Sequence, residues 1–257
     1  MRRGGLVRAA AAVVVAAVLA VGCGAGKKRA GRISSEERYR QALAFMEKED
    51  YARARAILGE IGVRELQETT LDPQVKLTLA DAFYLDGGIA NVIEAQSRYE
   101  QFLNFYPSDE KASYAQYQVG MCLFKQSAKP FHDQEYTRRA LDEFGKVKAI
   151  APASEFVAKA DEMRDRCSEK LAEHEYEVGR FYFRRKACEA ASGRFRGILK
   201  DYPRFSDIEA STFYLGQSLL CSNNVEEGKI YLSKLIEEHP QSEYAAKARE
   251  ALASRRG

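Results

Sequence analysis

Residues 179–203 read GRFYFRRKACEAASGRFRGILKDYP, and residues 216–240 read GQSLLCSNNVEEGKIYLSKLIEEHP. The two stretches differ in most letters but keep the same spacing of small, apolar and proline residues. If the opening glycine of each is position 8, both have a small residue at 20, large apolar residues at 24 and 27, and proline at 32. Apolar residues three to four apart predict helices, and small residues at fixed points predict that two helices cross closely there. The spacing therefore predicts a repeated pair of packed helices.

The same register recurs in the rest of the chain. It fits residues 39–61, it fits residues 117–152 with an eight-residue insertion between the two helices, and it fits residues 77–107 more loosely. A period of this length is typical of the tetratricopeptide repeat (TPR). The predicted fold is all-α: a TPR solenoid of about five helix-turn-helix units plus a C-terminal capping helix, over residues 34–257. The N-terminal repeats occupy about 34–110 and the C-terminal repeats about 111–257.

Proline closes four of the units, and in three of them a residue suited to capping a helix follows two residues later. The prolines are Pro107, Pro152, Pro203 and Pro240, and the capping residues are Asp109, Ser154 and Ser242. Residues 153–185 contain no proline and only one glycine. They therefore form either one long helix or two helices joined end to end.

The charge balance argues against a protein that binds nucleic acid. The chain carries 40 Lys and Arg against 37 Asp and Glu, a net charge of +3. Arg2, Arg3 and Arg8 supply this excess, and residues 1–22 contain no acid. A surface that binds a polyanion through its field usually has a clear basic excess. No nucleic-acid partner is predicted.

Residues 1–22 have the pattern of a secretory signal. The three arginines precede a run of Ala, Val and Leu, Ala9 to Val21, which is shorter than the ~20 residues that span a bilayer. The run ends in Gly22 and Cys23, as in a bacterial lipoprotein signal, although Ala20 stands where leucine is usual. We predict that Cys23 is lipidated; the alternative is ordinary signal cleavage. Glycine rather than aspartate after Cys23 implies sorting to the outer membrane.

Residues 23–33 have the composition of a flexible tether that begins at the lipidated cysteine. Lys27, Lys28, Arg29 and Arg32 give it four positive charges. These charges either favour an anionic bilayer surface or simply keep the linker solvated. No later apolar run is long enough to span a membrane.

The sequence contains no constellation of catalytic or metal-binding residues. His132, His174 and His239 are scattered, and none has a partner at metal-ligand spacing. The H-E-x-x-H, G-x-S-x-G and C-x-x-C motifs are missing from the sequence. No enzymatic activity, metal or cofactor is predicted.

Four cysteines remain besides Cys23: Cys122, Cys167, Cys188 and Cys221. Cys188 opens the second helix of the fourth unit, and Cys221 closes the first helix of the fifth. In a TPR stack these helices are neighbours and both ends lie at the same edge. Because a secreted protein tolerates disulfides, we expect that this pair can form one. The alternative is two small buried thiols.

The first helix of four units carries an aromatic residue at position 5 and an apolar residue at position 12: Tyr39 and Met46, Tyr117 and Phe124, Tyr176 and Phe183, Phe213 and Leu220. In TPR arrays these positions line the concave groove in which peptides dock, but they share a stripe with position 8 and also pack on neighbouring helices. Packing is the favoured interpretation. In the first unit, which no repeat precedes, Tyr39, Leu43 and Met46 are predicted to form an exposed groove.

Three segments resemble the BamD family of outer-membrane assembly lipoproteins. The first is residues 129–140, where Asp133, Gln134 and Thr137 are similar to the family's Arg-Asp-Gln-x-x-Thr stretch, with His132 in place of the arginine. The second, residues 171–182, reads LAEHEYEVGRFY, and the third combines GRF at 193–195 with ILKDYP at 198–203. With the anchor, the resemblance covers essentially the whole chain.

The resemblance implies a scaffold that is held by its lipid in the inner leaflet of the outer membrane and faces the periplasm. Its C-terminal repeats would bind the POTRA domains of a BamA-like barrel insertase, with Arg194, Tyr176 and Arg180 as contacts. Arginine suits this role because it can pair bidentately with a carboxylate. The N-terminal repeats would bind unfolded outer-membrane proteins through the groove of the first unit. Other assembly lipoproteins would be further partners.

A TPR lipoprotein of the cell-constriction or pilus-assembly machinery is the alternative, since it would share the fold and the anchor. Residues 176–203 distinguish the two, because such proteins are not expected to share this segment in detail.

Overall fold

The computed structural model describes residues 33–61, 70–127, 129 and 132–254. The predicted signal segment, Cys23 and nearly all of the tether lie outside these residues. Residues 34–257 belong to one compact unit. The helices that it describes are α1 (Ser35–Glu47), α2 (Tyr51–Glu60), α4 (Asp72–Asp86), α5 (Ile89–Phe105), α6 (Ala112–Gln126), α7 (Glu135–Ile150), α8 (Phe156–Arg184), α9 (Cys188–Asp201), α10 (Ile208–Cys221), α11 (Val225–Glu238) and α12 (Glu243–Ala253).

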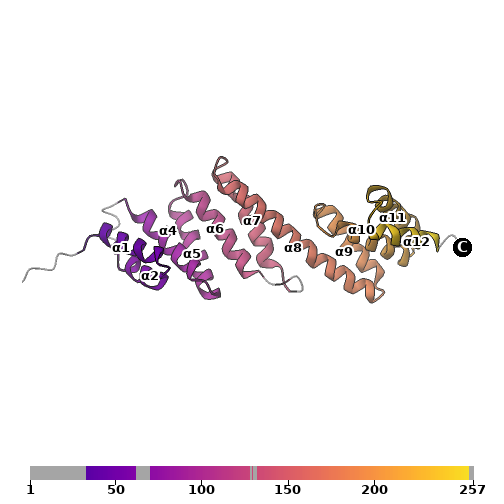
Figure 1. The fold of residues 1–257 in the computed structure, drawn as a ribbon, viewed down its shortest axis with the longest axis horizontal. Helices are drawn as coiled ribbons and strands as arrows, with labels where there is room; N and C mark the ends of the chain where they lie inside the picture. Colours follow the sequence, from indigo (N-terminus) through magenta and orange to yellow (C-terminus); the bar gives the residue numbers. More distant parts are fainter. Residues whose placement is uncertain (1–32, 62–69, 128, 130–131, 255–257) are drawn as a thin grey trace, which may run out of the picture. The chain divides into compact units, whose positions relative to one another are not determined.

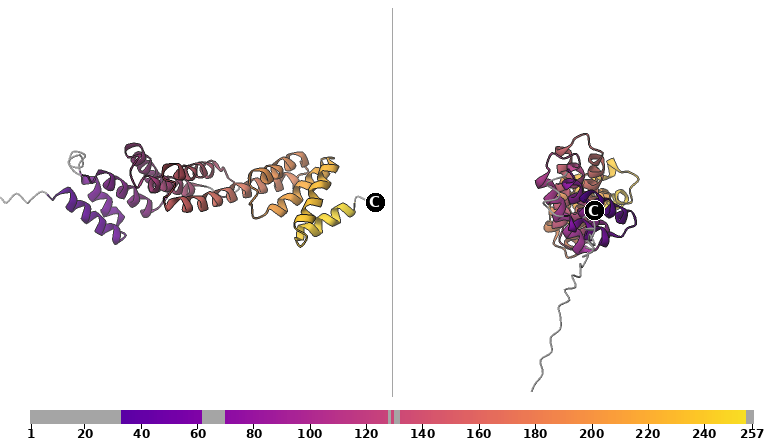
Figure 2. Two further views of the ribbon diagram at one scale, coloured as in Figure 1. Left: turned by 90° about the horizontal axis from the view of Figure 1, so that it is seen from above. Right: turned by 90° about the vertical axis from the view of Figure 1, so that its left-hand side faces the viewer.

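Each helix packs against the next one in the chain. The five predicted pairs are α1 with α2, α4 with α5, α6 with α7, α8 with α9 and α10 with α11, and the second helix of each pair also packs on the helix that follows it. The order can be followed along the colours in Figure 1 and from two further directions in Figure 2. The helix pairs and the closing helix α12 confirm the predicted TPR-type fold.

Glycine at position 8 allows the two helices of a unit to approach closely. A Cβ atom added to Gly179 would lie 2.9 Å from the ring of Phe195, and one added to Gly216 would lie 2.6 Å from the side chain of Leu232. Both distances are shorter than a van der Waals contact, so the position-24 side chain occupies the space that a methyl group would need. The third pair of this kind, across the insertion, is Gly120 and Phe144 at 2.6 Å.

The same turn joins the two helices in the first, fourth and fifth units. The residue at position 15 has a positive φ: Glu49 (57°), Lys186 (60°) and Asn223 (67°). The next amide then donates to the carbonyl five residues earlier: Asp50 to Phe45 (2.9 Å), Ala187 to Tyr182 (3.0 Å) and Asn224 to Leu219 (2.9 Å). This is the Schellman cap, which ends a helix through one left-handed residue.

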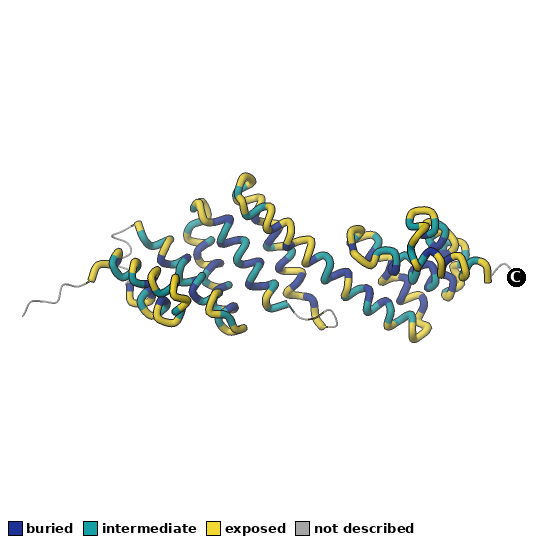
Figure 3. The backbone as a smooth tube through the Cα atoms, in the orientation of Figure 1, coloured by how far each residue is buried: buried dark blue, intermediate teal, exposed yellow. Residues whose placement is uncertain are grey.

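Residues 153–185 contain a single 29-residue helix, α8, which decides between the two predicted alternatives. Its buried residues recur every three or four positions: Ala160, Met163, Cys167, Leu171, Ala172, Tyr176 and Gly179. The first three pack in the core formed with α4 to α7, whereas Ala172 and Tyr176 pack in the core of α9 and α10. Figure 3 shows the buried positions, in dark blue, recurring along the helices. One helix therefore serves two cores.

The four prolines each lie two residues beyond the end of a helix, at α5, α7, α9 and α11. Ser242 caps α12 by accepting from the amide of Tyr244 at 3.2 Å. Ser154 accepts from the amide of Phe156 at 3.2 Å but lies one residue before the N-cap residue of α8, which is Glu155. Asp109 accepts from the amide of Lys111 in the turn before α6 and is not its N-cap residue, which is Lys111.

Candidate partner-binding surfaces

Arg194 lies at the surface of α9 and forms an ion pair with Glu175 of α8. Its Nη1 donates to Oε2 of Glu175 at 2.9 Å, and the two side chains are 43% and 23% exposed. This hydrogen bond is the main reason why the pKa of Arg194 is raised. Because a guanidinium has five N–H donors, Arg194 keeps donors for a partner's carboxylate.

Tyr176 lies in the core and not at the surface, which corrects its predicted role as a direct partner contact. The residue is 6% exposed. Three rings from α9, α10 and the turn between them cover it: Phe195, Phe205 and Tyr214. Tyr176 therefore supports the surface from beneath.

Arg180 is half-buried beside the same aromatic residues. Its guanidinium carbon lies 5.6 Å from the ring centre of Tyr176 and 5.8 Å from that of Tyr214. Both distances fit cation–π contacts. Of the predicted trio, Arg194 is exposed, Arg180 is half-buried and Tyr176 is buried, so Tyr176 cannot contact a partner beside the two arginines.

The predicted groove of the first unit is only partly exposed. The hydroxyl of Tyr39 shares a 3.1 Å hydrogen bond with Oγ1 of Thr78 on α4. Its ring packs on the small core that α1, α2 and α4 form around Ala42, Leu58 and Val75. Leu43 is 36% exposed, and Met46 is half-buried. The three residues lie along one face of α1, and Leu43 is the most exposed of them.

A larger cleft lies where α8 passes from one core to the other; we call it the step cleft. Its volume is about 920 Å³. The lining comes from α6, from α8 and from the end of α9 with the turn that follows. These residues are Phe124, Glu162, Asp165, Arg166, Ser168, Glu169, Lys170, Glu173, Asp201, Tyr202, Pro203, Arg204 and Phe205. Phe124 is the position-12 residue of the third unit, but its position in the repeat does not predict a cleft.

A second feature that the sequence did not reveal is a group of exposed apolar residues at the turn between α4 and α5. Leu85, Ile89 and Ile93 are 53%, 60% and 51% exposed. Gly87 and Gly88 form the turn with φ of 75° and 74°. Apolar residues at four-residue spacing are also typical of a buried helix face, so the sequence carried no signal that these three are exposed.

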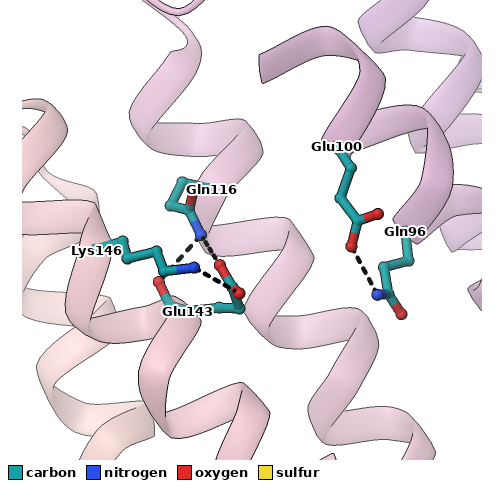
Figure 4. Close-up of polar contacts among 5 residues, drawn as sticks. All are labelled: Gln96, Glu100, Gln116, Glu143 and Lys146. Atoms are coloured by element: carbon teal, nitrogen blue, oxygen red, sulfur yellow. Dashed lines mark hydrogen bonds and ion pairs between the residues drawn. The ribbon is translucent and has the colours of Figure 1, made fainter. Parts of the chain in front are cut away.

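Amide and carboxylate side chains join α6 to α7 (Figure 4). Nε2 of Gln116 on α6 donates to Oε2 of Glu143 on α7 at 2.7 Å and to its carbonyl at 3.2 Å, and Lys146 pairs with the same carboxylate at 2.8 Å. On α5, Nε2 of Gln96 donates to Glu100 of the same helix at 2.7 Å. The contacts of Gln116 fix α6, whose Phe124 lines the step cleft, against α7.

The segment that resembles the family's Asp-Gln-x-x-Thr stretch has a structural role. Gln134 is 1% exposed; its Nε2 donates to the carbonyls of Lys129 and His132 at 2.9 and 3.0 Å. Its Oε1 accepts from the hydroxyl of Thr137 at 2.8 Å. The amide therefore holds the insertion against the start of α7.

The structure joins Cys188 and Cys221 by a disulfide whose Cα atoms are 5.8 Å apart, within the roughly 4.4–6.8 Å that a disulfide spans. The bond connects the start of α9 to the end of α10, at the edge predicted from the repeat register. Cys122 and Cys167 are buried free thiols. Burial raises the pKa of each to about 12. Oxidation of the Cys188–Cys221 pair in the cell stays a prediction.

Two searches of the described residues give no sign of another kind of site. None of their helices is both long and apolar enough to cross a membrane. Within the same residues, no group of three or more His, Cys, Asp or Glu side chains is placed to hold a metal ion.

Known proteins similar to the chain include outer-membrane assembly factors. The family YfiO, described as outer membrane lipoprotein, matches residues 32–220. The outer membrane protein assembly factor BamD of Rickettsia prowazekii is 25% identical over 206 residues, which cover 80% of each chain. BamD of Caulobacter vibrioides is 28% identical over 224 residues, 85% of this chain and 72% of that one. The solved TPR2AB domain of yeast Sti1, in a pHSP90 complex, covers 84% of this chain and 83% of its own at 14% identity and a TM-score of 0.44.

The helix pairs described above define a helical repeat protein of the TPR type. The family match extends over most of these repeats, from the start of the first unit to the end of α10. The chain belongs to the BamD/YfiO family of outer membrane lipoproteins. This assignment confirms the family resemblance and agrees with the prediction of a non-enzymatic protein.

Proposed function

We propose that the chain is a non-enzymatic scaffold of the outer-membrane β-barrel assembly machinery. The family match over residues 32–220 carries this proposal, and relatives that are similar over most of their length are named assembly factors.

Cys23 is the proposed anchor. Its lipid would hold the chain in the inner leaflet of the outer membrane, with the helical unit in the periplasm. The signal-like run before Cys23 and the membership of an outer membrane lipoprotein family support this placement. Substitution Cys23→Ser should release the chain from membranes, as measured by fractionation.

The C-terminal repeats are proposed to bind the POTRA domains of a BamA-like insertase, with Arg194 as the principal contact and Arg180 as a secondary one. Arg194 is exposed and has spare donors, so a partner carboxylate can bind beside Glu175. Other assembly lipoproteins are proposed as further partners on the same scaffold.

Affinity purification of the lipidated chain from membranes tests this proposal. The expected result is co-purification of a barrel protein with periplasmic POTRA domains, and strong loss of that protein with Arg194→Glu. Arg196→Glu is the matched control, because Arg196 also lies on α9, is 46% exposed and pairs with Glu227 at 2.8 Å. Recovery of constriction or pilus proteins instead would support the alternative function.

The first unit is proposed to receive unfolded outer-membrane proteins through Leu43 and Met46, with Tyr39 as a supporting residue. Leu43 and Met46 are one turn apart on α1, so both can contact an apolar side chain of an extended substrate. Leu43→Glu should reduce cross-linking to such substrates. Ala44→Glu, at an exposed neighbouring position, is the control.

A further inference from the structure

The step cleft exists because α8 is twice as long as a TPR helix needs to be. Its first half packs on α7 and its second half pairs with α9. The last core residue of the first half is Cys167, and Ala172 begins the next core. The helix pair α8–α9 is therefore offset along α8, and the turn after α9 lies across a cleft from α6.

The walls of the step cleft combine aromatic and acidic side chains. Phe124 supplies a ring from α6, and Tyr202 and Phe205 supply rings from the turn after α9. Along α8, Glu162, Asp165, Glu169 and Glu173 follow one another at intervals of three or four residues, which places them on one face of the helix. Five acidic and three basic side chains line the cleft, which gives it a net charge of −2.

The three basic side chains of the cleft are all engaged within the chain. Arg204 forms a two-pronged ion pair with Asp165. Nζ of Lys170 donates to Oγ of Ser127 at 2.6 Å. Arg166 donates to the sulfur of Met163 at 3.4 Å, and its guanidinium carbon lies 5.3 Å from the ring centre of Phe124. Among the described residues, none of these three cations forms an ion pair with Glu162, Glu173 or Asp201.

Three of the acids, by contrast, are exposed and form no hydrogen bond or ion pair among the described residues: Glu162, Glu173 and Asp201. Glu169 accepts from the amide of Ser206 at 3.2 Å, and this contact holds the turn after α9 against α8. This hydrogen bond fixes one wall of the cleft, and the carboxylates of Glu162, Glu173 and Asp201 are available at its rim.

We propose that the step cleft binds a segment of the barrel insertase's periplasmic region that carries lysine or arginine side chains, an inference that rests on the proposed function. The aliphatic stem of such a side chain packs on the rings, and its charged head reaches the free carboxylates. The cleft and the Arg194 surface share α8, because Glu175, the partner of Arg194, lies two residues beyond Glu173 of the cleft on this helix. One partner that spans this part of α8 can therefore contact both.

Charge reversal at the rim tests the proposal. The double variant Glu162→Lys with Glu173→Lys changes two exposed positions of the cleft. We expect about tenfold or greater loss of affinity for the purified periplasmic region of the insertase, with a weaker dependence on salt. The control variant, Asp142→Lys with Glu237→Lys, makes the same charge change at exposed helical positions outside the cleft, and is expected to bind as the native chain does.

A second measurement does not depend on charge variants. A photo-reactive residue in place of Ser168, which lines the cleft, should cross-link the full lipidated chain to an insertase residue within a few positions of a lysine or arginine, as located by fragmentation of the cross-linked peptide. If the native chain binds the insertase but neither charge reversal nor Ser168 cross-linking involves the cleft, the cleft proposal is wrong and the proposed function stands. If the native chain does not bind the insertase, both are wrong.

Discussion

The hydroxyl of Tyr99 on α5 donates a 2.6 Å hydrogen bond to Oδ1 of Asp81 on α4. Tyr114 of α6 donates to the same oxygen at 2.7 Å. One carboxylate therefore ties together three consecutive helices of the second and third units. Burial is the largest cause that raises the pKa of Asp81 above its usual 3.8, and the two hydrogen bonds only partly oppose it.

The raised pKa of Asp81 predicts how its replacement changes stability with pH. The native state binds the proton more tightly than the unfolded state, so the contribution of Asp81 to stability falls as pH rises from 3.8 to the higher native pKa. Asp81→Asn keeps an oxygen that accepts from both tyrosines. We expect its unfolding free energy to rise relative to the native chain through that window, as measured by urea denaturation at a series of pH values.

Asp81→Ala is the control for the hydrogen bonds. It leaves two buried hydroxyls without their acceptor, which should cost about 1–3 kcal/mol. A difference between Asp81→Asn and the native chain that does not vary with pH would contradict the argument.

The contact between Gly179 and Phe195 predicts opposite effects for two glycine substitutions. Gly179→Ala places a methyl group 2.9 Å from a fully buried ring, and overpacking of this kind costs about 1–3 kcal/mol. Gly193→Ala, on α9, meets no atom within 4 Å and should stabilise the chain by about 0.5–1 kcal/mol through helix propensity. Thermal unfolding of both variants measures this, and equal effects would contradict the repeat register.

The left-handed residue of the fourth turn predicts a stabilising substitution. Lys186 has a φ of 60°, where a side chain is strained and glycine is not, so Lys186→Gly should stabilise the chain by about 1 kcal/mol. Lys200→Gly, within α9, should instead destabilise it by a similar amount. Chemical denaturation distinguishes the two, and a loss of stability in both would show that the turn does not need the left-handed conformation.

The cysteine arrangement predicts a definite pattern of alkylation. Besides Cys23, the chain has four cysteines. In native protein without reductant none of the four should react, because Cys122 and Cys167 are buried and Cys188 and Cys221 form a disulfide. Denaturation should release two, and denaturation with reductant all four, as read by intact mass. Four reactive thiols in denatured, non-reduced protein would exclude the disulfide.

The repeat register could be predicted from the sequence because it rests on residue types with a direct local effect: glycine leaves room for a crossing helix, and proline cannot continue a helix. Gly179, Gly216 and the prolines fixed the helix pairs. The length of α8 could not be decided, since an apolar stripe at three- and four-residue spacing fits one helix or two. The structure shows that α8 is one helix, whose two halves pack in two different cores.

The candidate surfaces were predictable in part. Arg194 is exposed, as a contact residue must be, whereas Tyr176 is covered by Phe205 from a turn beyond its own helix pair. The step cleft depends on the same turn meeting α8, a contact between residues about forty positions apart. Periodicity along one helix carries no information on such contacts.

Controlled depletion of the chain in its own cells tests the assembly function most directly. The account predicts that folded β-barrel proteins in the outer membrane, measured by their heat-modifiable migration, decline as the chain is depleted, and that expression of the native chain restores them while Cys23→Ser does not. Undiminished folding of barrel proteins, with defects confined to pili or cell constriction, would contradict it.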